Sequence, residues 1–159
     1  QNATGKRFYA RDRVATIDRG AIRVAPIAPD DDCLTTVRQG ALRSYCGNSA
    51  LYYEYLSVDE VRTFDTPPNV ALLDADRLRY PLTLRRWREG DRFIPFGMTG
   101  SKKVSDFLVD AKVSMPEKQR QFVLLSGDEI AWLVGRRIDD RYRLTRGTEN
   151  VLRITKEIL

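Results

Sequence analysis

The residues of this chain that are best suited to chemistry are positive charges. Residues 85–120 carry nine lysines and arginines against five acidic residues, with aromatic and turn-forming residues between them. Lys102 and Lys103 come directly before an apolar repeat with helical spacing. Unpaired N–H groups at a helix start, with two ammonium groups beside them, favour phosphate. Lysine there opposes the helix dipole by about 0.3–1 kcal/mol, which suggests a functional reason for the pair. The alternative is that both lysines are solvated loop residues.

Three elements must position these lysines. Gly90 and Asp91 are turn formers, so a strand that ends near Trp87 is expected to fold back into residues 92–94. Residues 95–100 form a loop with two glycines, where the backbone can approach a ligand closely. Apolar residues then recur at the spacing of one helical face, which predicts a helix from residue 104. They are Val104, Phe107, Leu108 and Ala111.

The remaining pattern is rich in strands. A hairpin is predicted near each end of the chain, with strands 13–17 and 21–25 in the first and 122–125 and 129–134 in the second. Further strands are expected at residues 51–56, 70–73, 82–85, 142–145 and 150–154, and a short helix at residues 57–64. Ile130, Trp132 and Val134 alternate with Ala131 and Leu133, so that strand is expected to be covered on both faces, with Trp132 in the core. Many strands with one clear helix indicate an α+β fold.

A change in charge balance predicts a domain boundary. Residues 1–66 carry nine basic and nine acidic residues, whereas residues 67–159 carry eighteen and thirteen and so supply the whole net charge of +5. The boundary is placed at Thr66-Pro67-Pro68. A β-rich segment, 1–66, is therefore expected before a basic domain, 67–159, whose charge favours an anionic partner.

Several site classes are excluded or disfavoured. The chain has no histidine, which removes catalytic triads and histidine-bound metals. Cys33 and Cys46 are too few and too far apart for a zinc site, and free buried thiols are expected. The acidic run 30–32 lacks the spaced ligands of a calcium loop, and Asp74 and Asp76 suit turns and caps. Residues 97–103 lack phosphate-loop spacing. No run approaches the ~18 apolar residues of a membrane helix. No catalytic residue, metal site or cofactor site is therefore expected.

Two ordered motifs resemble the C-terminal domain of the tRNA(Ile)-lysidine synthase family. The first consists of Trp87, Gly90, Asp91, Arg92, Phe93, Pro95, Gly97, Met98, Gly100, Lys102, Lys103, Ser105, Asp106 and Phe107. The second consists of Ile130, Trp132, Val134, Gly135, Arg137, Ile138, Asp139, Arg141, Tyr142 and Thr148. The resemblance covers residues 67–159, with a looser match upstream. It implies a compact β-sandwich-like α+β domain, similar to a domain of the phenylalanyl-tRNA synthetase β-subunit.

The resemblance also implies a function. Members of this family use ATP to adenylate a wobble cytidine of tRNA(Ile) and then attach lysine, and their C-terminal domain helps to hold the tRNA near its acceptor stem. ATP and Mg²⁺ would bind an N-terminal catalytic domain whose signature motif is missing here. The chain, which starts without methionine, is therefore expected to be a non-catalytic part of a longer cytoplasmic ligase. Its expected partners are tRNA(Ile) and that catalytic domain, with lysine and ATP as substrates of the whole enzyme.

The same resemblance nominates phosphate contacts. Lys102 and Lys103 are the leading candidates, followed by Arg85, Arg88, Arg92, Lys112, Arg120, Arg137 and Arg141. Arg136, Arg141 and Arg143 would add a second contact edge if they point outward, and Arg137 is expected to pair with Asp139 or Asp140. The alternative function is a structural module that docks on the catalytic domain or dimerises, and a free-standing RNA-binding protein is disfavoured. Internal pairing of the cations would favour docking, and a shared face of residues 85–120 and 135–143 would favour RNA binding.

Overall fold

The computed structural model describes residues 7–10, 13–18, 20–26 and 34–159, and it describes side chains at residues 20–22 and 34–159. The chain forms two compact units, Gln1–Asp32 and Cys33–Leu159. The predicted acidic loop at residues 30–32 and Cys33 lie outside the described residues. Cys46 is a buried thiol that takes part in no disulfide, as predicted.

The first unit contains a small antiparallel sheet. Strands β2 (Arg13–Asp18) and β3 (Ala21–Pro26) pair along their whole length, with Ile17 opposite Ile22. This is the hairpin that the sequence predicted, and Gly20 takes the positive φ of 78° that its turn requires. A further strand, β1 (Arg7–Ala10), adds to the other edge of β2.

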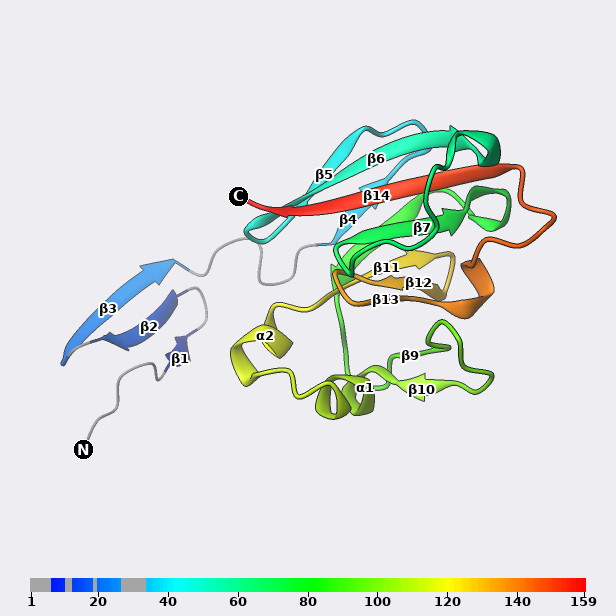
Figure 1. Cartoon of the computed structure of the whole chain (residues 1–159). Helices are drawn as coiled ribbons and strands as arrows, with labels where there is room; N and C mark the ends of the chain where they lie inside the picture. The colour runs from blue at the N-terminus through cyan, green and yellow to red at the C-terminus, as the bar shows by residue number, and fades with distance from the viewer. Residues whose placement is uncertain (1–6, 11–12, 19, 27–33) are drawn as a thin grey trace. The chain divides into compact units, whose positions relative to one another are not determined.

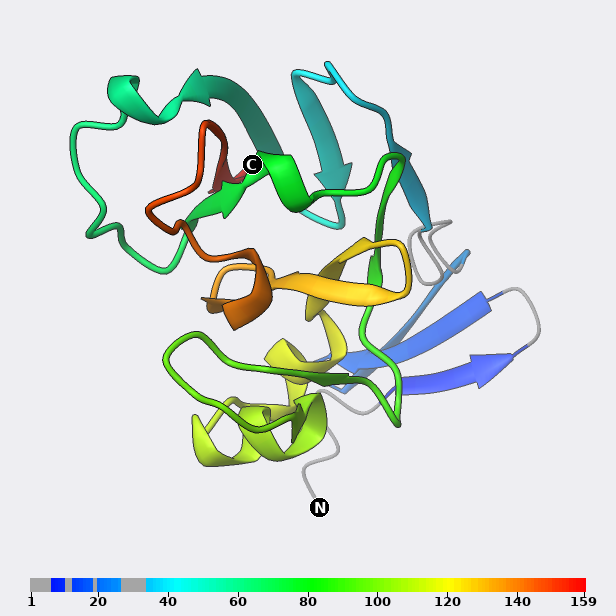
Figure 2. The ribbon, with the colours of Figure 1, turned by 90° about the vertical axis from the view of Figure 1, so that its right-hand side faces the viewer.

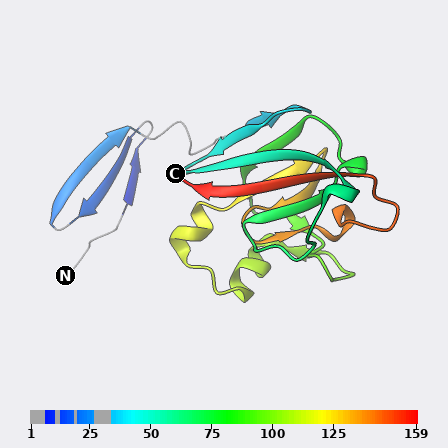
Figure 3. The same cartoon turned by 45° about the horizontal axis from the view of Figure 1, so that its top comes forward.

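The second unit is built on two larger antiparallel sheets (Figure 1). The five-stranded sheet has the order β13 (Arg137–Ile138), β12 (Glu129–Leu133), β11 (Phe122–Ser126), β8 (Leu82–Arg86) and β4 (Thr35–Val37). The four-stranded sheet has the order β5 (Arg43–Cys46), β6 (Ser49–Ser57), β14 (Asn150–Ile158) and β7 (Val70–Asp74). Figure 3 shows β14 running between β6 and β7. The last strand, β14, is therefore an interior strand of the four-stranded sheet.

The two sheets pack face to face around one hydrophobic core. The five-stranded sheet contributes residues such as Leu84, Leu124 and Trp132, and the four-stranded sheet contributes Leu73 and Ile154. All five side chains are at most 1% exposed. This packing makes the unit a β-sandwich, and the whole chain has the sheet-rich α+β fold that was predicted.

A third layer covers the outer face of the five-stranded sheet. It consists of β9 (Arg92–Phe93), β10 (Lys102–Lys103), α1 (Val104–Asp110) and α2 (Met115–Gln119). Figure 2 shows this layer on the side opposite to the four-stranded sheet. Val104 and Leu108 of α1 pack with Val123 and Leu133 in a second buried cluster. The strand β12 is thus covered on both faces, as its sequence predicted.

Four local predictions are wrong. Ile130 and Ala131 lie on the faces opposite to those predicted, because the register shifts between Leu124 and Leu125 and leaves one extra residue in β12. Ile130 is in the outer cluster, and Ala131 is in the inner core together with Trp132. β9 pairs with β10 and not with β8. Residues Asp140–Tyr142 form a 3₁₀ turn that Asp139 caps, which replaces the strand predicted at 142–145. The helix predicted at 57–64 is only a 3₁₀ turn, Val58–Glu60.

The compact units divide after Asp32, whereas the charge balance indicated residues 66 and 67. Strand β6 pairs with β14 over its nine residues, and β4 pairs with β8. Residues on both sides of Pro67 therefore share one core. The charge balance reflects which residues are on the surface of the molecule. It does not indicate which strands pair with one another.

Candidate nucleic-acid interface

The two leading lysines lie at the start of α1, where the sequence placed them, but their surroundings differ. Lys102 is in β10, its ammonium group forms an ion pair with Asp110, and it lies 6.0 Å from the centre of the Phe107 ring. Lys103 occupies the N-cap position of α1, is exposed, and has no ion pair with a described residue. Lys103 is therefore the lysine of the pair that is open to a ligand.

Arg85 is held inside the fold by Asp91. Its two terminal nitrogens donate to the Asp91 carboxylate at 2.9 and 3.0 Å, and the two side chains are only 12% and 14% exposed. The same carboxylate accepts the backbone N–H of Arg88 at 2.7 Å, which fixes the turn through Gly90. The guanidinium of Arg88 is exposed and makes no ion pair within the described part of the chain. Arg85 thus holds the Asp91 carboxylate that fixes the turn, whereas the Arg88 side chain lies in solvent.

The other predicted contacts of residues 85–120 are on the surface. Arg92 donates to the Ser101 hydroxyl at 2.8 Å, which ties β9 to β10. Lys112 follows α1 with a positive φ of 56°, a conformation that glycine adopts more easily. Lys112 and Arg120 are both exposed and form no ion pair with any residue that the structure describes. Lys103, Lys112 and Arg120 are therefore exposed cations of the α1–α2 segment (residues 103–120) that have no ion pair within the described part of the chain.

Residues 135–143 are organised by the buried carboxylate of Asp139, which is 0% exposed. It accepts the backbone N–H groups of Ile94 at 2.8 Å and Arg141 at 2.9 Å, and the Arg141 guanidinium at 2.9 and 3.0 Å. Arg141 also pairs with Glu129. The hydrogen bonds to Asp139 raise the pKa of Arg141 above its usual value, although burial acts in the opposite direction. Arg141 is thus part of the support for this connection.

The expected outward fan of arginines is therefore wrong in detail. Arg136 donates to the Gln121 side chain at 2.8 Å and pairs with Glu117 at 3.4 Å, and Arg143 pairs with Asp140 at 3.1 Å. Arg137 does not form the predicted pair with Asp139 or Asp140, because Arg141 and Arg143 occupy those carboxylates. Its guanidinium lies 5.3 Å from the centre of the Phe107 ring and is exposed.

Residues 94–97, which are a part of the stretch 85–120, lie beside residues 135–143. The backbone N–H of Phe96 donates to the Ile138 carbonyl at 3.0 Å, and that of Asp140 donates to the Ile94 carbonyl at 2.7 Å. The stacking of Arg137 on Phe107 joins the same connection to α1. Internal pairing, which favours docking, is thus present for Arg85, Lys102 and Arg141, whereas a shared face of the cations of residues 85–120 and 135–143 stays a prediction.

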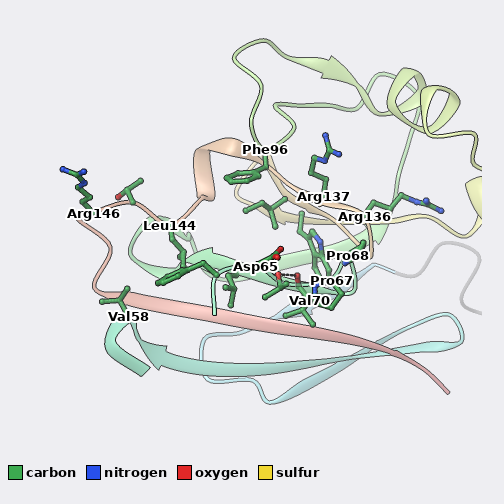
Figure 4. A pocket seen from close by; sticks show the side chains of 16 residues that line it. Val58, Asp65, Pro67, Pro68, Val70, Phe96, Arg136, Arg137, Leu144 and Arg146 are labelled. Carbon is green, nitrogen blue, oxygen red and sulfur yellow. Dashed lines mark hydrogen bonds between the residues drawn. The ribbon is translucent and has the colours of Figure 1, made fainter. Parts of the chain in front are cut away.

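A groove of about 710 Å³ opens beside β7 and β13 (Figure 4). Its walls include Phe64, Phe96 and Leu144, and Arg137 and Arg146 reach it from residues 136–146. The phenylalanine side chains are 64% and 51% exposed. Sequence reasoning missed Phe64, Phe96 and Arg146. The available signal for the groove was that both phenylalanines lie close to prolines in segments with few strand-forming residues.

No group of three or more His, Cys, Asp or Glu side chains within the described residues is placed to hold a metal ion. None of the helices in that part of the chain is both long enough and apolar enough to cross a membrane.

The fold and this surface define a class: a β-sandwich domain with a short helical layer that carries exposed cations. The model of the TilS substrate C-terminal domain family matches residues 82–154. A tRNA(Ile)-lysidine synthase of Bacteroides thetaiotaomicron is 36% identical over 152 residues, which cover 93% of this chain and 32% of that protein. A second, of Parabacteroides distasonis, is 52% identical over 96 residues, which cover 58% of this chain and 22% of that protein. The chain belongs to the tRNA(Ile)-lysidine synthase family.

A solved structure described as the TilS C-terminal domain superposes with a TM-score of 0.61 at 21% identity, over 70% of this chain and 85% of that one. This likeness confirms the fold. The chain spans about a third or less of the length of the two relatives named above, with 32% and 22% of their sequences covered.

Proposed function

We propose that this chain supplies the tRNA-holding part of an ATP-dependent ligase that attaches lysine to the wobble cytidine of tRNA(Ile). Membership in the tRNA(Ile)-lysidine synthase family supports this proposal. The observation that carries it is the set of exposed cations on the α1–α2 segment, Lys103, Lys112 and Arg120, none of which is paired with a described residue. Surface cations without protein partners are available to neutralise phosphates.

The surface suits the backbone of duplex RNA. Proteins recognise A-form helices mainly by shape and by contacts to phosphates and 2′-hydroxyls, so base-reading side chains are not required. Among the phosphate contacts predicted from the sequence, the proposal rests on Lys103, Lys112 and Arg120. Arg88 and Arg137 are further exposed cations of that set. Arg85, Lys102 and Arg141 have carboxylate partners in the fold and act chiefly as structural residues.

The chemistry belongs to a different part of the enzyme. ATP, Mg²⁺ and lysine bind the catalytic domain of the full-length ligase in the cytoplasm, and this unit positions the acceptor-stem side of the tRNA against it. The chain by itself is then a binding module without ligase activity.

A second function is favoured by a separate observation. The α1–α2 segment exposes apolar side chains, with Val109 58% and Met115 67% exposed. Together with the internal ion pairs of Arg85, Lys102 and Arg141, these side chains suit docking on the catalytic domain or on a second copy of the chain. In that case the cations around them are ordinary surface residues.

A salt series separates the two functions. We expect binding of the chain to an acceptor-stem RNA duplex to weaken steeply with salt, because each phosphate contact contributes a slope of about −0.9 in log affinity against log salt on the B-DNA calibration. The variant Lys103→Ala/Lys112→Ala should flatten the slope by about two contacts. Arg38→Ala/Arg43→Ala is the matched control, because it removes two exposed charges next to β4 and at the start of β5, outside the α1–α2 segment. Equal slopes for wild type and both variants would instead support docking.

A further inference from the structure

The groove beside β7 and β13 combines apolar walls with cationic ends. Figure 4 places Phe96 over its middle, Arg146 toward one end, and Arg136 and Arg137 toward the other. Arg136 is occupied by Gln121 and Glu117, whereas Arg137 and Arg146 have no ion pair with a described residue. Two arginines are therefore available to an anionic ligand.

The walls of the groove are fixed by hydrogen bonds on each side. Phe96 is held by its own N–H bond to Ile138, and the next residue, Gly97, donates to the Asp140 carboxylate at 3.1 Å. The turn that carries Arg146 is closed by a bond of 2.9 Å from the Thr145 N–H to the Thr148 hydroxyl, which in turn donates to Asp74 at 3.0 Å. The site is preformed, and its volume of about 710 Å³ is typical of a ligand pocket.

The exposed rings suit an aromatic ligand. Phe64 and Phe96 are 64% and 51% exposed, so the faces of their rings are not buried in the core. The carboxylate of Asp65, which also lines the groove, accepts no hydrogen bond from a described residue. A carboxylate accepts from the N–H groups at the edge of a nucleobase, and it repels a phosphate. Apolar rings and a carboxylate inside, with arginines at the ends, are therefore complementary to a base placed inside and phosphates placed outside.

We infer that this groove binds unpaired nucleotides of the RNA, with a base against Phe96 and the flanking phosphates at Arg137 and Arg146. The inference rests on the proposed function and extends it from duplex to single-stranded RNA. Arg137 connects the two sites, because its side chain lines the groove and its guanidinium lies over Phe107 of α1. A duplex held at the α1–α2 segment can therefore pass its unpaired end into the groove.

The test compares two RNAs: a blunt acceptor-stem duplex and the same duplex with a four-nucleotide single-stranded 3′ extension. We expect the extension to strengthen binding by about tenfold, since stacking of one base on an aromatic side chain is typically of that size. Phe96→Ala should remove this gain and leave the binding of the blunt duplex unchanged. Phe96→Trp should restore the gain, because tryptophan also offers a stacking face. Tyr45→Ala is the matched control, since Tyr45 is equally exposed at 51% and lies on β5, outside the groove.

Each remaining outcome overturns the inference. If the extension adds no affinity to the wild type while the blunt duplex binds with a steep salt slope, the proposed function stands and the groove has another occupant, such as a protein segment. If the extension helps Phe96→Ala as much as the wild type, the unpaired nucleotides bind elsewhere. If AMP alone binds as tightly as the extension does, the groove is a mononucleotide site. If neither RNA binds, the proposed function fails as well.

Discussion

Asp139 determines how the connection 135–143 is held. Its carboxylate accepts two backbone N–H groups and a bidentate guanidinium at distances of 2.8 to 3.0 Å while fully buried. We expect Asp139→Ala to lower the free energy of unfolding by about 3 kcal/mol, because it leaves buried donors and one side of the Arg141 guanidinium without an acceptor. Urea denaturation measures the change.

The control for this substitution is Asp128→Ala. Asp128 is exposed in the β11–β12 turn and makes no side-chain hydrogen bond with a described residue, so its loss should change stability by less than about 0.5 kcal/mol. If Asp139→Ala costs no more than Asp128→Ala, the carboxylate is not the support that its contacts indicate.

At the residue scale, the sequence identified the charged types but could not assign their partners. Arg137 and Arg141 lie four positions apart with the same charge, yet Arg141 binds the buried carboxylate and Arg137 lies over Phe107. Which arginine binds Asp139 depends on the 3₁₀ turn that follows Asp139, and hydrophobic periodicity does not predict this turn. Phe64 and Phe96 were missed for a related reason, because only the fold leaves their rings exposed around one groove.

At the element scale, prediction succeeded where periodicity was strong. The apolar repeat from Val104 gives α1, and the two apolar runs on either side of the turn 126–128 give the β11–β12 hairpin. It failed where pairing decides the structure. The two-residue strands β9 and β10 exist through their mutual hydrogen bonds, and nothing within residues 92–93 distinguishes pairing with β10 from pairing with β8.

Strand β6 makes the stability of the sandwich sensitive to alkaline pH. The phenol of Tyr53 is 3% exposed and shares a hydrogen bond of 2.7 Å with Ser44, and burial raises the pKa of Tyr53 well above 10.0. The pKa of Tyr80 is likewise raised, to about 12. Above pH 10 the unfolded chain therefore loses protons that the folded chain keeps, and the free energy of unfolding should fall by about 1.4 kcal/mol per pH unit for Tyr53 until its folded pKa is reached. Tyr80 should contribute less, because it is more exposed to solvent.

Tyr53→Phe should accordingly show a shallower fall in stability between pH 10 and 11 than the wild type, measured by urea denaturation at each pH. Ser44→Ala is the matched variant, because it removes the same hydrogen bond but keeps the buried phenol, so it should retain the steep fall. Parallel pH profiles for Tyr53→Phe and the wild type would exclude Tyr53 as the group responsible.

At the scale of the whole molecule, both proposed RNA-binding surfaces belong to one of the two units. The cations of the proposed duplex surface and every residue that lines the groove belong to the unit Cys33–Leu159. Residues 1–32 carry six basic and five acidic residues, which is nearly balanced. The sequence could indicate a basic half, but only strand pairing shows that the sandwich begins before residue 67.

A chain that contains only residues 33–159 tests this division. Its two hydrophobic clusters are formed by residues of its own, so it should unfold in one cooperative transition with the midpoint of the main transition of the full chain. Its affinity for the acceptor-stem duplex and the slope of log affinity against log salt should also equal those of the full chain, because a slope counts phosphate contacts and the removed unit contributes none. A folded 33–159 chain whose slope is flatter by one contact or more would place part of the RNA surface on residues 1–32. Loss of cooperative unfolding would instead show that the first unit stabilises the sandwich.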